Sequence, residues 1–130
     1  MDNDAYRTAI TLIEQSKHVL ITTHIRPDGD ACGCVRAMLQ TLAHLGKTAS
    51  ALFMSPLASW YQCLFDEKPP VLASNGNPGD ITPAQLDTYY KDTDLIILVD
   101  TDSKVQLPGF AGWLATCGKK VLVIDHHITS

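Results

Sequence analysis

Histidine and aspartate side chains follow three separate apolar runs of this sequence. The run 19–23 is followed by His24, Asp28 and Asp30, the run 95–99 by Asp100, and the run 121–124 by Asp125, His126 and His127. Imidazole nitrogens mixed with carboxylate oxygens are ligands of divalent transition metals, and four or more acids require more than one ion. The pattern predicts a dinuclear metal site of a hydrolase, provided that the three runs bring these side chains together.

Short apolar runs alternate with segments of helical apolar spacing, and this alternation predicts how the side chains are positioned. Strands are expected over 19–23, 48–54, 94–100 and 119–124, with a short fifth strand over 71–73. Helices are expected over 6–13, over 35–45 with Gly46 as a cap, from Ser55-Pro56 to Leu64, from Thr82-Pro83 to about Tyr90, and over 110–117 with Gly118 as a cap.

Strands that alternate with helices predict an α/β fold, namely a Rossmann-like three-layer domain with a mostly parallel sheet of about five strands, covered on both faces by helices. In such a sheet, ligands bind outside the carboxyl ends of the strands. The three clusters of histidine and aspartate would therefore share one site.

Length and composition favour one compact domain over residues 1–130, without room for a second lobe. Hydrophobic residues make up 45% and charged residues 18%, and no apolar stretch approaches the roughly 20 residues of a membrane span. The acidic start, Met1-Asp2-Asn3-Asp4, is unlike a secretion signal. We therefore expect a soluble, cytoplasmic protein that does not contact membranes.

The formal net charge is −4, and the ten Lys and Arg residues are scattered with no run of three. A surface that coats long duplex nucleic acid is therefore not expected, and a nucleotide would be held locally, near cations that reverse the field of the acids. The four cysteines show no disulfide-dense spacing, so reduced thiols are expected. Cys32 and Cys34 lie near the acids and are either soft metal ligands or small buried apolar residues.

Each cluster also has an ordinary structural interpretation. Asp28-Gly29-Asp30 alone is a common turn or helix cap, Asp100 could cap the following turn, and a pair of histidines is often a surface feature. The coincidence of all three clusters with predicted strand ends favours the metal site.

The segment His24-Ile25-Arg26-Pro27-Asp28-Gly29-Asp30-Ala31, the strand that ends at Asp100, and Asp125-His126-His127 resemble the first three motifs of the DHH phosphoesterase superfamily. The resemblance covers essentially the whole chain, in the order and spacing of the family. Within the superfamily, the sequence is most similar to the branch of oligoribonucleases and pAp phosphatases. That branch also contains cyclic-dinucleotide phosphodiesterases and exopolyphosphatase-related proteins.

The resemblance implies a ligand set. His24 and Asp28 would bind one ion, Asp30 and His126 a second, and Asp100 would bridge both. The implied cofactors are two divalent metal ions, most often manganese in this family, with magnesium or cobalt as alternatives.

The resemblance also implies roles around the ions. Asp125 would orient ligands, and His127 would support the site or meet a phosphate oxygen, so that Asp100, Asp125 and His127 form the catalytic set. Arg26 would contact the substrate phosphate, although an ordinary solvated arginine is the competing interpretation. The implied activity is hydrolysis of phosphodiester or phosphomonoester bonds in nucleotides or short oligonucleotides, such as pAp, nanoRNA or cyclic dinucleotides.

Several departures from the family leave alternatives open. The family has a fourth acidic motif and a separate C-terminal substrate-binding domain, whereas this sequence stops three residues after His127. We therefore expect an incomplete DHH N-terminal domain, inactive or weakly active alone. Cys34 replaces a common Ser, and Leu107-Pro108-Gly109 lacks an Arg that often precedes the Gly.

The competing functions are a non-catalytic metal- or nucleotide-binding domain and a relative of the pyrophosphatase or exopolyphosphatase type. Homo-oligomers are also compatible with the sequence.

Overall fold

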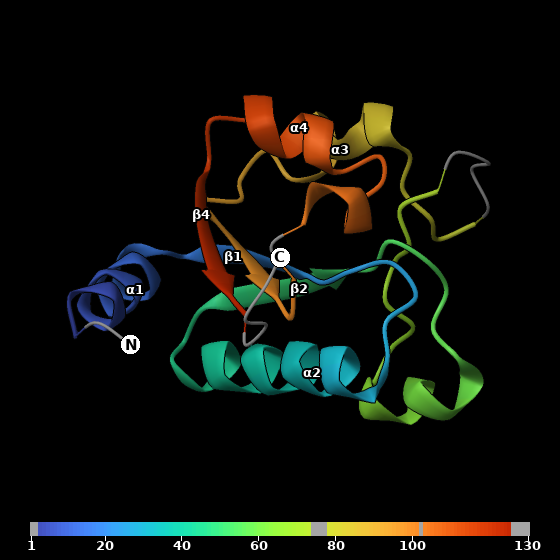
Figure 1. Ribbon diagram of the computed structural model, residues 1–130, viewed down its shortest axis with the longest axis horizontal. Helices are drawn as coiled ribbons and strands as arrows, with labels where there is room; N and C mark the ends of the chain where they lie inside the picture. The colour runs from blue at the N-terminus through green and yellow to red at the C-terminus, as the bar shows by residue number, and fades with distance from the viewer. Residues whose placement is uncertain (1–2, 74–77, 102, 126–130) are drawn as a thin grey trace.

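The structure is a computed structural model that describes residues 3–73, 78–101 and 103–125. Within these residues, four strands form an all-parallel sheet in the order β2-β1-β3-β4 (Figure 1). The strands are β1 (His18–Thr22), β2 (Thr48–Leu52), β3 (Leu95–Val99) and β4 (Lys120–Ile124). The α-helices are α1 (Asn3–Gln15), α2 (Gly29–His44), α3 (Leu86–Tyr89) and α4 (Ala111–Thr116), and the 3₁₀ helices are η1 (Ser59–Leu64), η2 (Pro83–Gln85) and η3 (Lys104–Gln106).

Helices lie on both sides of the sheet and produce two apolar clusters (Figure 1). Side chains alternate along β1, so that Leu20 faces the side of α3 and α4, while Val19 and Ile21 face α2. Every residue of β3 is buried, as expected for a strand covered on both faces. The α/β fold with a parallel sheet flanked by helices is thus confirmed.

The expected short strand over 71–73 forms only isolated bridges, Phe53 with Val71 and Leu72 with Ile81. The N–H of Phe53 donates to the carbonyl of Pro70, and the N–H of Leu72 donates to the carbonyl of Phe53. Because Pro70 has no N–H for the next carbonyl along β2, this ladder cannot extend toward the start of β2. The sheet consequently has four named strands in the described part of the chain, where about five were expected.

The strand order places a topological switch point between β1 and β3. From β1 the chain crosses to β2 on one side, and from β3 it crosses to β4 on the other. The two central strands pair in parallel, with Val19 opposite Leu95 and Thr22 opposite Leu98, so their carboxyl ends are level. Such a point opens a crevice in which ligands bind.

Asp94 holds the amino ends of the two central strands together. Its two carboxylate oxygens accept hydrogen bonds from the backbone N–H groups of Lys17 (2.8 Å) and His18 (3.1 Å). Its own N–H donates to the carbonyl of His18. These bonds fix the register of β1 and β3 at the edge opposite the switch-point crevice.

The two predicted glycine caps are confirmed. Gly46 follows α2 with φ +79°, and the N–H of Lys47 bonds back to the carbonyl of Leu42. Gly118 follows α4 with φ +73°. Both positions require the left-handed conformation that glycine adopts without a steric penalty.

The predicted helix from Ser55-Pro56 to Leu64 is wrong in its start and its type. The segment is helical only over η1, as a 3₁₀ helix, and its N-cap residue is Ala58. The Ser55 hydroxyl does not cap this helix and instead accepts a hydrogen bond from the N–H of Arg26 (2.7 Å). A tertiary contact with the loop after β1 therefore takes the place of the expected local cap.

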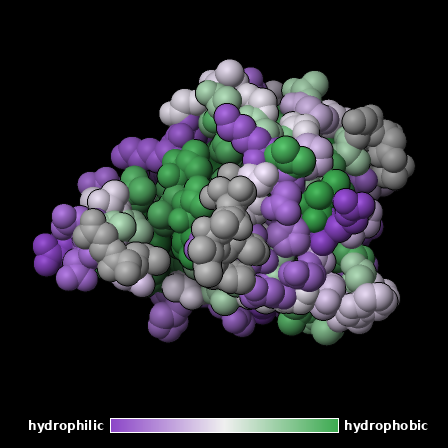
Figure 2. Space-filling view, in the orientation of Figure 1, coloured by the Kyte–Doolittle hydropathy of each residue, from purple (hydrophilic) through white to green (hydrophobic). Residues whose placement is uncertain are grey.

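The expectation that both faces of the sheet are covered fails at β4. Its residues Val121, Val123 and Ile124 are 36–44% exposed, and Figure 2 shows the hydrophobic surface over this strand. The helices on the two faces pack mainly over β1, β2 and β3, so β4 is covered only in part. In α1, likewise, Tyr6 and Ile10 of the predicted apolar stripe are each 53% exposed.

No helix in the described ranges is both long enough and apolar enough to cross a membrane.

Replacing Asp94 with alanine removes both acceptors from the N–H groups of Lys17 and His18. Because hydrogen bonds to a charged group contribute about 1.5–3 kcal/mol each and this site is exposed, we expect Asp94→Ala to lower the free energy of unfolding by roughly 1–3 kcal/mol. Urea unfolding measures the change, with Asp92→Ala in the adjacent exposed turn as the matched control. Equal stability of the two variants would contradict the stabilising role of the Asp94 hydrogen bonds.

Candidate metal centre

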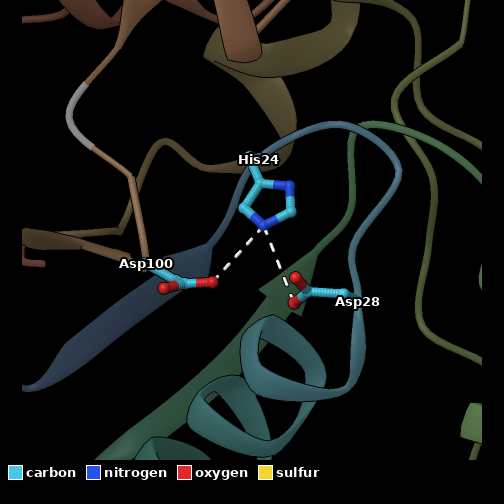
Figure 3. Close-up of side chains that lie close together, drawn as sticks. All are labelled: His24, Asp28 and Asp100. Carbon is cyan, nitrogen blue, oxygen red and sulfur yellow. Dashed lines mark ion pairs between the residues drawn. The ribbon is translucent and has the colours of Figure 1, made fainter. Parts of the chain in front are cut away.

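Three predicted site residues converge beyond the carboxyl ends of the central strands (Figure 3). His24 and Asp28 lie in the connection from β1 to α2, and Asp100 directly follows β3. The Nε2 atom of His24 lies 3.4 Å from Oδ2 of Asp100 and 3.9 Å from Oδ1 of Asp28. Atoms that bind one ion at about 2.1 Å lie on the order of 3–3.5 Å apart. The pair of His24 and Asp100 has this spacing, and all three ligand atoms lie within 4.8 Å of one another, so the group could hold one cation if Asp28 moved slightly closer.

The ring orientation of His24 is set by the backbone of the next residue. Nδ1 lies 2.8 Å from the carbonyl oxygen of Ile25, and because a carbonyl only accepts, Nδ1 must carry the proton that is donated. In the neutral ring, the lone pair is then on Nε2, the atom that faces both carboxylates. A metal ion bound at Nε2 would also lie next to the two carboxylates.

Asp100 is the buried member of the group. Its side chain is 3% exposed, and its backbone has φ +62°, a left-handed conformation that Asp tolerates better than most residues. The N–H of Asp100 donates to the carbonyl of Ile124 at the end of β4, and the hydroxyl of Thr23 donates to the carbonyl of Val99. Neighbouring strands on both sides thus hold this strained turn and its carboxylate.

Asp28 combines the ordinary role considered for it with a place in the group. It is the N-cap residue of α2, where its Oδ1 accepts a hydrogen bond from the N–H of Ala31 (2.9 Å). Its side chain is 65% exposed, so water screens its charge more than that of Asp100. The helix cap fixes the direction in which Asp28 presents its carboxylate to His24.

The loop between His24 and Asp28 is held at two further points. The N–H of Ile25 donates to the carbonyl of Gln106, and the N–H of Arg26 donates to the hydroxyl of Ser55. Arg26 is exposed, has φ +51°, and forms no ion pair with any other described residue. Thr23, Ser55 and Gln106 were not predicted from the sequence, because such supporting contacts have no local pattern.

The remaining predicted residues are placed only in part. Asp30 is exposed in the first turn of α2, and its Oδ1 accepts a weak hydrogen bond from the thiol of Cys34 (3.7 Å). Asp125 is partly buried and directly follows β4. Neither belongs to the group of three formed among the described residues. His126 and His127 lie outside the described residues.

The two cysteines near the acids fit the apolar interpretation better than the ligand interpretation. Burial, with a smaller effect of Asp28, raises the pKa of Cys32 to about 11, and burial together with Asp30 raises the pKa of Cys34. Both effects disfavour the thiolate, which is the form that binds metals. Cys32 packs in the cluster between α2 and the sheet.

A groove of about 620 Å³ lies elsewhere, along the free side of β2, and none of His24, Asp28 and Asp100 lines it. The candidate centre is instead a cluster of polar side chains at the edge of the sheet. Position at the switch point and chemistry, rather than cavity volume, identify it.

Fold and centre together define a Rossmann-like α/β domain in which a histidine and two aspartates at the switch point could hold a cation. Residues 18–130 match the DHH family, N-terminal domain, and the chain therefore belongs to the DHH family. The fold is also similar to the crystal structure of an exopolyphosphatase-related protein from Bacteroides fragilis, with a TM-score of 0.75 and 15% sequence identity. That alignment covers 98% of this chain and 36% of the other, so this chain spans little more than a third of that protein's length.

The two roles of Asp28 can be separated by substitution. We expect Asp28→Ala to destabilise the domain by about 1 kcal/mol because the cap on the N–H of Ala31 is lost, whereas Asp28→Asn should stay close to the original stability because Asn caps as well as Asp. Thermal or urea unfolding without added metal measures both. Equal loss in the two variants would show that charge, and not the cap, determines the contribution of Asp28 to stability.

Proposed function

We propose that this chain is the metal-binding domain of a phosphoesterase that hydrolyses phosphodiester or phosphomonoester bonds in nucleotides or short oligonucleotides. The observation that carries the proposal is the convergence of His24, Asp28 and Asp100 within 4.8 Å, at the switch point of a DHH-family domain. The orientation of His24 supports it further, since Nε2 faces the two carboxylates with its lone pair when the ring is neutral.

Two divalent ions, most often manganese in this family, are the proposed cofactors. His24 and Asp28 would hold the first ion, Asp30 and His126 the second, and the two oxygens of Asp100 would serve both. Mixed imidazole and carboxylate ligands suit manganese, and also magnesium or cobalt. The support for Asp30 is its position two residues after Asp28, in the first turn of the same helix.

When bound, a pair of such ions activates water near neutral pH and stabilises the charge that develops during in-line attack on phosphorus. The residues of the chain would position the reactants. Asp100 and His24 would fix the ligand geometry, because the backbone N–H of Asp100 is bonded to the end of β4 and the His24 ring is bonded to the carbonyl of Ile25. Arg26 would attract a phosphate oxygen, and Asp125 and His127 would orient groups at the end of β4.

A separate substrate-binding domain is part of the proposal. The similar protein from Bacteroides fragilis is much longer than this chain, and a second domain that encloses the switch-point edge would supply further contacts to the substrate. Because positioning contributes a large part of enzymatic rate, we expect residues 1–130 alone to bind metal better than they catalyse.

Metal binding tests the centre without depending on turnover. If manganese binds only the folded domain, a free concentration 100 times Kd stabilises it by about 2.7 kcal/mol, which is roughly 10 °C in Tm for a domain of this size. We expect Asp100→Asn to abolish most of this shift. Asn accepts the left-handed backbone of residue 100, so the metal-free fold should persist.

The matched control is Asp66→Asn, because Asp66 is a 91% exposed carboxylate whose partner is Arg36 and which lies outside the cluster. This variant should keep the full manganese shift. A shift of equal size in Asp100→Asn and the unchanged chain would refute the role of Asp100.

Hydrolysis tests the reaction class. We expect manganese-dependent release of phosphate or mononucleotide from pAp or a dinucleotide, and at least a 100-fold loss in His24→Gln, because an ion held by fewer ligands is bound weakly and misplaced. The assay compares residues 1–130 with a longer natural version of the protein. Metal binding without any hydrolysis in both would favour the non-catalytic alternative, and preference for pyrophosphate or polyphosphate would favour the pyrophosphatase or exopolyphosphatase type.

A further inference from the structure

Trp60 is a large aromatic side chain that is left 71% exposed. A single exposed apolar residue needs no special explanation. Trp60, however, belongs to η1, which packs against α2 near the end that begins after Asp28 (Figure 1). This packing of its segment against the helix that Asp28 caps distinguishes Trp60 from an isolated surface residue.

The 3₁₀ geometry of η1 determines which side chains of this segment face outward. In the helix predicted from sequence, Trp60 shares an apolar stripe with Leu57, Tyr61 and Leu64. A 3₁₀ helix has three residues per turn, so side chains three apart lie on the same face. Tyr61 and Leu64 pack against the core, and on the other face Trp60 and Cys63 are exposed.

Two contacts link this segment to the part of the chain that carries His24, Asp28 and Asp30. Carbon and oxygen atoms of the Tyr61 ring lie 3.4 Å from the position that a Cβ would have at Gly29, the residue between Asp28 and Asp30. At the start of the segment, the Ser55 hydroxyl holds the N–H of Arg26. The segment thus meets this part of the chain at both residue 26 and residue 29.

The indole of Trp60 meets the Tyr61 ring edge to face, with ring centroids 5.9 Å apart and an angle of 63° between the planes. The Tyr61 ring therefore links Trp60 to Gly29. This contact steadies the indole while it leaves most of its surface open to a ligand.

We propose that Trp60 is the platform on which the base of a nucleotide stacks while the phosphate lies at His24, Asp28 and Asp100. This inference rests on the proposed function and adds where the nucleoside part of the substrate binds. Every base has a flat π face, so such a platform requires a base but tolerates its identity. Arg26, which lies between His24 and Asp28 in the sequence, would contribute the positive charge that favours a phosphate in this acidic site.

Fluorescence gives a direct test because the chain has only two tryptophans. Trp113 is fixed by a hydrogen bond from Nε1 to Asp87 (2.6 Å) and contacts Phe110, on the opposite side of the sheet from η1. Trp113→Phe leaves Trp60 as the single emitter, and Trp60→Phe leaves Trp113. With magnesium present, we expect AMP to quench the emission of the Trp113→Phe protein and to leave the Trp60→Phe protein unchanged.

Calorimetry measures the contribution of the base to affinity. We expect Trp60→Ala to weaken AMP binding roughly 10- to 100-fold, the usual loss when an aromatic platform is removed, and Trp60→Phe to restore part of it. Ribose 5-phosphate has the phosphate without the base, so its affinity should change little in either variant. Unfolding curves check that the exposed position tolerates both substitutions, and the manganese shift in Tm checks the metal centre.

The outcomes separate the two proposals. If AMP and ribose 5-phosphate bind the unchanged chain with equal affinity, or if Trp60→Ala leaves AMP affinity unchanged, the stacking platform is overturned and the metal centre stands. If neither ligand binds and manganese does not shift Tm, both the platform and the proposed function are overturned.

Discussion

The parallel pairing of β1 with β3 is the constraint on which the rest of the structure depends. It makes the two central strands level, with Thr22 opposite Leu98, and it sends the chain to opposite sides of the sheet after each of them. His24 and Asp100 are 76 residues apart in sequence, and this pairing brings the ends of the two strands that they follow side by side. Without it, the motifs would be three unrelated polar turns, each with an ordinary structural explanation.

Backbone conformation at the carboxyl edge opposes stability, and the fold supports it from outside. The left-handed backbones at Arg26 and Asp100 are conformations that cost free energy in residues with a side chain. Bonds from the strand ends and from Ser55 hold them in place. At the amino edge, by contrast, the Asp94 carboxylate accepts hydrogen bonds from two backbone N–H groups.

The sequence specified features that depend on local physics. The four long apolar runs form strands within one or two residues of their expected bounds. Gly46 and Gly118 follow the ends of helices because the chain there adopts a left-handed conformation, which glycine favours. Strand order was beyond reach, since it depends on which long-range pairing buries most surface. Residues 55–64 were mispredicted for a related reason, because Ser55 bonds to a distant loop and an apolar stripe with period 3.6 also accommodates a 3₁₀ turn. Exposure of β4 likewise follows from helix placement that no local pattern encodes.

The sequence motif therefore supplies the ligand types of the candidate centre, while contacts made by the fold supply their geometry. Asp28 can be recognised from its spacing to His24, but its geometry comes from capping α2, and the direction of His24 comes from the carbonyl of Ile25. A sequence that kept the motif but had no hydroxyl at position 55 would keep every ligand type and lose one of the hydrogen bonds that hold the loop. Because the affinity of a metal centre declines when its ligands are free to move, Ser55, as well as the ligands themselves, would matter to a metal bound here.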